Sequence, residues 1–116
     1  MSEATAANKD VIKRLYEEFF TDGHVEVADE LMTEGYVNHA PPPGTGPSRE
    51  DLKGAVMQFH QTLSEFRAEL IRTVAEDDLV ATQGEFRGVT ASGEPTTIKI
   101  IDLFRFEHGR IAERWG

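Results

Sequence analysis

Asp102 is the residue whose position most clearly predicts chemistry. It lies in Thr96–Glu107, where side chains should alternate between the two faces of a strand. One of these faces is apolar apart from Asp102, and it consists of Ile98, Ile100, Asp102, Phe104 and Phe106. A charged, unpaired carboxylate is costly to desolvate in such surroundings, so it either finds a partner or its pKa rises. We therefore expect Asp102 to point inward.

Two hypotheses for the role of Asp102 follow. A raised pKa suits a general acid or base that works near neutral pH. The alternative is a structural aspartate, bonded by backbone amides at a bulge or by Arg110 or Arg114 on the following strand. The residues alone leave both readings open.

Three other side chains could take part in chemistry, and each also has an ordinary structural reading. Tyr16 lies on an apolar helix face, where a tyrosine is often a core residue. Asn38 and His39 precede the proline-rich loop Ala40–Pro47, where an Asn can bond the turn and a His can face solvent. The four histidines have no metal-binding spacing, and no phosphate-binding glycine motif is present, so we predict neither a metal nor a nucleotide cofactor.

The elements that must position these residues fall into two halves. Apolar residues at helical period predict helices over Thr5–Thr21 and Val25–Met32, and a third that begins after the N-cap Ser48. Tyr36–His39 is expected to be a short extended piece. From Phe66 the period changes to two, which predicts the strands Phe66–Ala75, Leu79–Gly88, Thr96–Glu107 and Arg110–Trp115. Three helices followed by an antiparallel meander make an α+β fold, with residues 1–116 as one domain.

Composition excludes several classes of function. The net charge of −9 disfavours nucleic acid and anionic membranes as partners. No apolar run is long enough for a membrane span, and the segment Met1–Asn8 does not look like a leader peptide. The chain has no cysteine, which rules out disulfides and thiolate chemistry and fits a cytoplasmic protein.

Several motifs together resemble the SnoaL-like polyketide cyclases of the nuclear transport factor 2-like superfamily. The stretches that carry the resemblance are Asn8–Phe20, Tyr36-Val37-Asn38-His39 with the prolines after it, Ile101–Ile111, and Glu113-Arg114-Trp115. They occur in the family's order and span nearly the whole chain. The resemblance implies a cone-shaped domain in which three helices close a strongly curved antiparallel sheet around a ligand pocket, and it implies frequent homodimers.

The resemblance also implies roles for residues. In the family's cyclases a pocket aspartate is the general acid/base of an intramolecular aldol closure, without a metal or organic cofactor, and it maps onto Asp102. The pocket tyrosine of the first helix maps onto Tyr16, and the Asn of the proline-flanked motif maps onto Asn38, with His39 beside it. Trp115 matches an aromatic wall. Gly84–Pro95 is shorter than in most members and has no His, and the sequence stops at Gly116, just after Trp115. Together these two departures predict either a shallower, more open site or a shortened chain.

The leading hypothesis is therefore a cofactor-free lyase or isomerase that acts on a small apolar molecule with a carbonyl group. Asp102, His39 and Asn38 would be catalytic; the residues that contact substrate would be Tyr16, Phe59, Ile100, Phe104 and Trp115. Steroid-isomerase-like and epoxide-hydrolase-like activities are related possibilities, the second disfavoured because Asp102 is the one carboxylate clearly expected inward. The other class is a non-catalytic binding or dimerisation domain, since the outward face Lys99-Ile101-Leu103-Arg105 is half apolar and suits packing between sheets.

Overall fold

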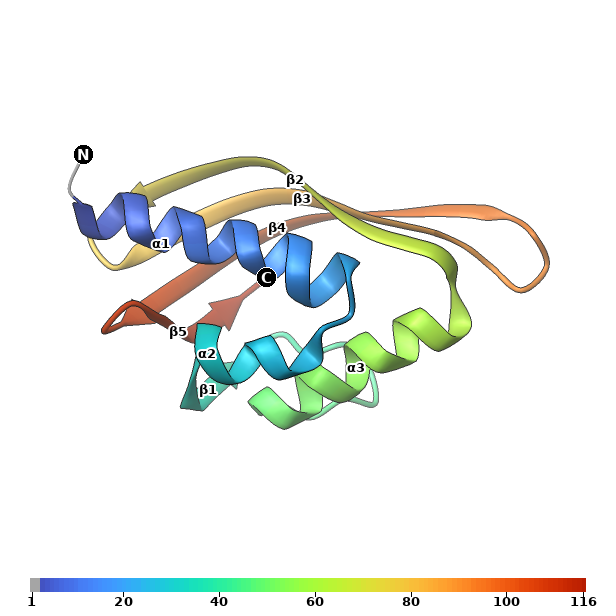
Figure 1. The fold of residues 1–116 in the computed structure, drawn as a ribbon, viewed down its shortest axis with the longest axis horizontal. Coiled ribbons are helices and arrows are strands. Elements are labelled where there is room, and N and C mark those ends of the chain that lie inside the picture. The colour runs from blue at the N-terminus through green and yellow to red at the C-terminus, as the bar shows by residue number, and fades with distance from the viewer. Residues whose placement is uncertain (1–2) are drawn as a thin grey trace.

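A five-stranded sheet forms one layer of the molecule, and the helices pack against its inner face (Figure 1). The structure is a computed structural model that describes residues 3–116. Met1 and Ser2 lie outside the described residues, although the expected domain and the segment Met1–Asn8 include them. The strands are β1 (Met32–Asn38), β2 (Ser64–Glu76), β3 (Leu79–Val89), β4 (Pro95–Glu107) and β5 (Arg110–Trp115). Their order across the sheet is β1-β5-β4-β3-β2.

The predicted meander is confirmed, but the expectation of a purely antiparallel sheet is wrong at one edge. Strands β2 to β5 pair antiparallel in sequence order. β1 pairs with β5 in parallel, with Asn38 opposite Arg114, so the sheet is mixed. Parallel neighbours need a long crossover, and here the crossover is the third helix with the rest of the meander. Of the short extended piece predicted at Tyr36–His39, the first three residues form the end of β1, and His39 follows the strand.

The first predicted helix continues to Thr21 but changes its winding. It consists of α1 (Glu3–Arg14) and the π-helical segment η1 (Leu15–Thr21). At its end the Asp22 N–H donates to the Glu17 carbonyl, five residues back, over 3.0 Å. The wider turn keeps Leu15 and Phe20, five residues apart, on one face, and π-helical turns are frequent at functional sites.

The second predicted helix is shorter than expected. It consists of the 3₁₀ turn η2 (Val25–Val27) and α2 (Ala28–Leu31), and Met32 already belongs to β1. The third helix, α3 (Arg49–Thr62), begins as predicted. Ser48 accepts the Asp51 N–H through its side chain, and the Asp51 carboxylate accepts the Ser48 N–H, which completes a capping box.

The hairpin of β3 and β4 reaches beyond the helices, at the right of Figure 1. The molecule is accordingly long in one direction, with extents of 46 × 26 × 21 Å. Ile98, on the inner face of this hairpin, is 51% exposed, whereas Asp102 and Phe104 further along the same face are buried. The inner face of β4 is therefore buried in the core at Asp102 and Phe104 and becomes open to solvent towards Ile98. Within residues 3–116, no helix has the length and apolar character needed to cross a membrane.

Candidate functional site

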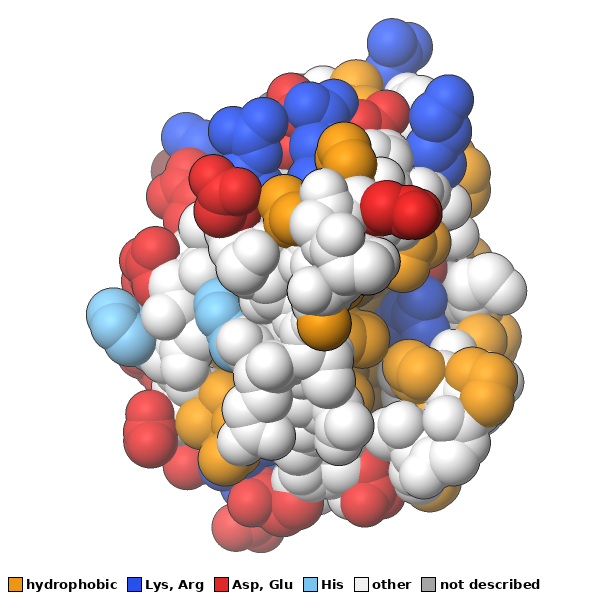
Figure 2. Space-filling view, turned by 90° about the vertical axis from the view of Figure 1, so that its right-hand side faces the viewer, with side chains coloured by type: hydrophobic (Ala, Val, Ile, Leu, Met, Phe, Trp, Pro, Cys, Tyr) orange, Lys and Arg blue, Asp and Glu red, His pale blue; other side chains and the backbone are white. Residues whose placement is uncertain are grey.

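An apolar cavity of about 320 Å³ lies between the inner face of the sheet and the helices. Its lining comes from η1, β1, the proline-rich loop, α3 and three strands of the meander, and comprises Leu15, Phe20, Met32, Tyr36, Asn38, Ala40, Pro42, Leu52, Phe59, Phe86, Ile98, Ile100, Asp102, Phe104 and Arg114. Hydrophobic side chains edge the hollow on the face shown in Figure 2. The volume lies at the lower end of the range for small-molecule sites.

Asp102 lies in the wall of this cavity and is paired with Arg114. Only 7% of Asp102 is exposed, and its Oδ1 accepts a hydrogen bond from Arg114 Nη2 over 2.7 Å. Burial raises the pKa of Asp102 above the ordinary aspartate value, while the hydrogen bond and charge of Arg114 act to lower it. Burial is the larger effect, so this carboxyl group takes up a proton more readily than a surface aspartate does.

Arg114 also connects Asp102 to the proline-rich loop. Its Nη1 donates to Asn38 Oδ1 over 2.9 Å and to the carbonyl of Ala40 over 2.8 Å. The Ala40 N–H donates to the same Asn38 oxygen over 2.9 Å. Arg114 can reach both sides because it lies on β5, opposite Phe104 of β4 and opposite Asn38 of β1. Arg114 is one of the two arginines that the sequence predicts as possible partners of Asp102.

Aromatic rings line the cavity away from the polar groups. Phe86 lies against Phe20 with ring centroids 4.9 Å apart, and against Phe59 at 6.1 Å. Phe59, Ile100 and Phe104, all predicted to contact substrate, line the cavity. Since Asn38, Asp102 and Arg114 supply its charged and amide groups, the cavity has a polar end and an aromatic body.

Two buried tyrosines flank Asp102 in different ways. Tyr16, predicted to contact substrate, is 1% exposed, packs in the core against Gly84 of β3 and is not part of the cavity lining. Burial raises its pKa to about 12, and the Thr82 hydroxyl lies near enough to oppose this rise. Tyr36 does line the cavity, and burial raises its pKa as well, with Arg114 and Asp102 acting on it.

The hydroxyls of Tyr16, Tyr36 and Thr82 are buried and have no hydrogen-bond partner of good geometry among the described residues. Each such group is unfavourable by about 1–3 kcal/mol. Tyr36 is a residue that the sequence analysis missed. The sequence could have indicated Tyr36, because it precedes Asn38 by two positions, and residues two apart in a strand point to the same side.

His39 and Trp115 lie together on the other side of the sheet. Their rings are stacked, with centroids 5.0 Å apart, and His39 Nε2 lies 2.8 Å from a carboxylate oxygen of Glu113. The His39 side chain is 41% exposed and Trp115 is 36% exposed, and neither lines the cavity. The structure thus separates His39 from its neighbour Asn38, because the alternation of β1 continues into His39, whose N–H still donates to the Arg114 carbonyl of β5 over 2.8 Å.

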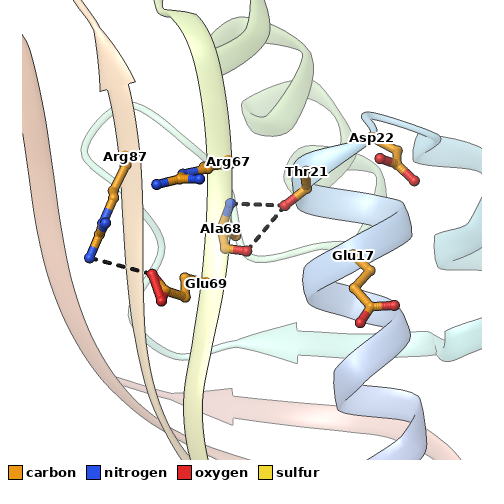
Figure 3. A pocket seen from close by; sticks show the side chains of 7 residues that line it. All are labelled: Glu17, Thr21, Asp22, Arg67, Ala68, Glu69 and Arg87. Carbon is orange, nitrogen blue, oxygen red and sulfur yellow. Dashed lines mark hydrogen bonds and ion pairs between the residues drawn. The ribbon is translucent and has the colours of Figure 1, made fainter.

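A second hollow, of about 440 Å³, lies between η1 and the edge strand β2 (Figure 3). Thr21 Oγ1 accepts from the Ala68 N–H over 2.9 Å and donates to the Ala68 carbonyl over 3.1 Å. Arg87 pairs with Glu69 at 3.4 Å. The Thr21 hydroxyl thus satisfies the backbone of one residue on the free edge of the sheet, and the ion pair joins exposed charges; neither contact brings a buried reactive group to the hollow.

Metal ligands are not gathered anywhere in residues 3–116, where no group of three His, Cys, Asp or Glu side chains could hold an ion. Within the lining of the apolar cavity, Asp102 is the one carboxylate.

Comparison with known proteins gives one matching family model and a set of similar solved structures. A family model described as a SnoaL-like domain matches residues 12–114. IdmH, a "putative polyketide cyclase" from Streptomyces antibioticus, is 30% identical, with 93% of this chain and 88% of IdmH covered and a TM-score of 0.81. A "putative polyketide cyclase" from Bacillus cereus ATCC 10987 is 25% identical over 99% of this chain and 76% of its own, with a TM-score of 0.89.

TsrD from Streptomyces laurentii, at 20% identity, shares the fold with a TM-score of 0.83, and the match covers 99% of this chain and 88% of TsrD. No curated protein matches the chain.

Proposed function

Because the chain belongs to the SnoaL-like domain family, we propose that it is a cofactor-free enzyme of the polyketide-cyclase type. Its reaction would be an aldol cyclisation, or a related isomerisation, of a small apolar molecule with a carbonyl group. The observation that carries the proposal is Asp102, a buried carboxylate with a raised pKa in the wall of an otherwise apolar cavity. A carboxyl group whose pKa is raised in this way is better suited to take a proton and return it than a surface aspartate is.

The reaction needs one proton transfer in each direction. The Asp102 carboxylate removes a proton from the carbon next to a carbonyl, and the electron pair of that bond moves onto the carbonyl oxygen to give an enolate. The enolate carbon then forms a bond to a second carbonyl carbon, whose oxygen becomes an alkoxide and takes the proton back from Asp102. Asn38 would donate a hydrogen bond to a developing oxyanion, and Phe59, Ile100 and Phe104 would pack against the apolar body.

Hydrogen exchange tests this proposal without knowledge of the natural substrate. 2-Tetralone, an enolisable ketone with a two-ring apolar body, is incubated with the protein in D₂O, and loss of its α-hydrogens is followed by NMR. We expect the protein to accelerate the exchange and Asp102→Asn to lose at least about 100-fold of that acceleration, the usual contribution of one general base. The matched control is Glu113→Gln, which removes a carboxylate on the opposite side of the sheet. An equal rate in Asp102→Asn and wild type would refute the proposal.

A non-catalytic binding domain is the second candidate, and one observation favours it. Arg114 pairs with Asp102, which gives this carboxylate a structural partner of the kind that the sequence analysis considered. In that case 2-tetralone would bind, with or without Asp102→Asn, and its α-hydrogens would exchange no faster than in buffer. An epoxide hydrolase is less favoured, since Asp102 is the one carboxylate in the described cavity lining.

We also propose that the protein forms a homodimer through the outer face of the sheet. Large hydrophobic side chains are exposed on this face: Val37, Ile71, Val74, Ile101 and Trp115. Ile101 is 68% exposed and Val74 65%. A half-apolar sheet face of this kind favours association with a second sheet. A cytoplasmic location stays a prediction from the sequence.

A further inference from the structure

We propose that Arg114 is a positioning residue of this site, one that fixes the orientation of two groups at once, the Asp102 carboxylate and the Asn38 amide. The inference rests on the proposed function and adds to it a residue that determines which atom of each group meets the substrate. Its basis is the set of contacts that a single guanidinium makes across three strands.

The position of Arg114 in the sheet makes these contacts possible. β5 lies between β1 and β4, so a side chain on its inner face has neighbours on both sides. Arg114 Nη2 donates to Asp102 and Nη1 donates to Asn38 and Ala40. The planar guanidinium has several donors in a fixed arrangement, which a lysine lacks. The Gly116 backbone lies against the same pair, since a Cβ at that position would be 2.8 Å from Asp102 Oδ1.

For Asp102, the contact selects the reactive oxygen. Oδ1 is taken by Arg114, whereas Oδ2 accepts no hydrogen bond within the described part of the chain. Oδ2 is also not among the fully enclosed polar atoms that lack a partner. It therefore meets open space, and the open space beside Asp102 is the cavity. Oδ2 is the oxygen that would take the proton from substrate.

For Asn38, the contact selects the end of the amide that faces substrate. Oδ1 receives two hydrogen bonds, from Arg114 Nη1 and from the Ala40 N–H. If the amide were reversed, its NH₂ group would face these two donors, which is unfavourable. The Nδ2 group has no partner in the described residues and is not enclosed either, so it is available to the cavity as a donor. Arg114 thus places a base and an oxyanion donor at one end of the cavity.

Arg114 also affects how easily Asp102 loses its proton. Among the described residues, the ionisable groups that act on Asp102 or are acted on by it are Arg114 from β5, Tyr16 from η1 and Tyr36 from β1. Among these, Arg114 is the cation that opposes the effect of burial on the pKa of Asp102. Without Arg114, burial would act unopposed and the pKa of Asp102 would rise further. The base would then reach its active, deprotonated form only at higher pH.

The test is the pH profile of 2-tetralone exchange in wild type, Arg114→Met, Arg114→Lys and Arg105→Met. Arg105 is the matched control, because it is bonded to two carboxylates on the outer face of the same sheet. We expect the midpoint of the profile to move to higher pH in Arg114→Met, by about 1–3 pH units, the usual effect of an arginine on an adjacent aspartate. Arg114→Lys should return the midpoint part of the way towards the wild-type value, because it restores a positive charge. Its kcat should stay below that of wild type, since one ammonium cannot hold both the Asp102 carboxylate and the Asn38 amide. Arg105→Met should match wild type.

A second measurement does not depend on turnover. Carboxyl-carbon NMR titration of Asp102 in the free protein should show the same upward shift in Arg114→Met. An unchanged Asp102 titration in a folded Arg114→Met protein would overturn the inference, even if the proposed function held. A wild-type protein that fails to accelerate exchange, together with the expected NMR shift, would refute the proposed function while leaving the placement of Asp102 by Arg114 supported.

Discussion

Gly84 is a position where one added methyl group should disturb the packing of the core. Gly84 lies on the inner face of β3, opposite Ile100 of β4, and the Tyr16 ring packs directly against it. A Cβ at this position would overlap the Tyr16 hydroxyl and lie 2.6 Å from Cε2 and 2.8 Å from Cζ. Relaxed carbon contacts are about 3.5–4.0 Å, so the ring would have to move by about 1 Å.

The Tyr16 ring has little room for such a shift. It is 1% exposed and lies edge-on against Phe20, with ring centroids 5.5 Å apart. We therefore expect Gly84→Ala to lower the free energy of unfolding by about 1–3 kcal/mol, the usual effect of overpacking a core. Urea denaturation measures this change directly. In the Gly84→Ala background, Tyr16→Phe should restore part of the lost stability. It removes the hydroxyl, which is the atom nearest to the added Cβ, but it leaves the close ring carbons Cε2 and Cζ in place.

Gly54 provides a control of opposite sign. It lies in α3 with nothing within 4 Å of an added Cβ. Gly54→Ala should therefore raise the free energy of unfolding by about 0.5–1 kcal/mol, through helix propensity alone. If Gly84→Ala were as stable as wild type, or if its effect added fully to that of Tyr16→Phe, the packing argument would be refuted.

Two further predictions concern the hydroxyl of Tyr36 and the outer face of the sheet. Tyr36→Phe removes a buried hydroxyl that has no partner in the described chain, so it should leave the unfolding free energy unchanged or raise it by about 1 kcal/mol; a loss of stability in urea denaturation would contradict this. Light scattering coupled to gel filtration should give a dimer mass for wild type and a monomer mass for Ile101→Lys. Met57→Lys, an exposed hydrophobic on α3, should remain dimeric, and a monomeric wild type at micromolar concentration would refute the interface.

The inner face of β4 could be predicted from alternation alone. Asp102, Phe104 and Phe106 are all buried on the same side, as their spacing indicated. The rule works here because β4 lies between two antiparallel neighbours, so its residues keep their register without interruption along β3. The same spacing did not reveal that Ile98 is half exposed. That depends on where the helices end relative to the hairpin, which is a property of tertiary packing.

Features that depend on distant segments could not be predicted in the same way. The parallel pairing of β1 with β5 joins residues more than seventy positions apart, such as Asn38 and Arg114. Local spacing carries no signal for it. The side of the sheet taken by Trp115 was within reach, however. Once Arg114 is assigned to the inner face as a partner of Asp102, its neighbour Trp115 must face outward.

The structural and the catalytic readings of Asp102 use different atoms of the same carboxylate. A buried aspartate without a partner would stay protonated and would be a poor base at neutral pH. One held by several donors would have a low pKa and would bind protons too weakly. Arg114 bonds Oδ1 alone, so the charge is stabilised enough to form while burial still raises the pKa. The ion pair that explains why Asp102 can be buried is thus the arrangement that leaves Oδ2 able to exchange a proton.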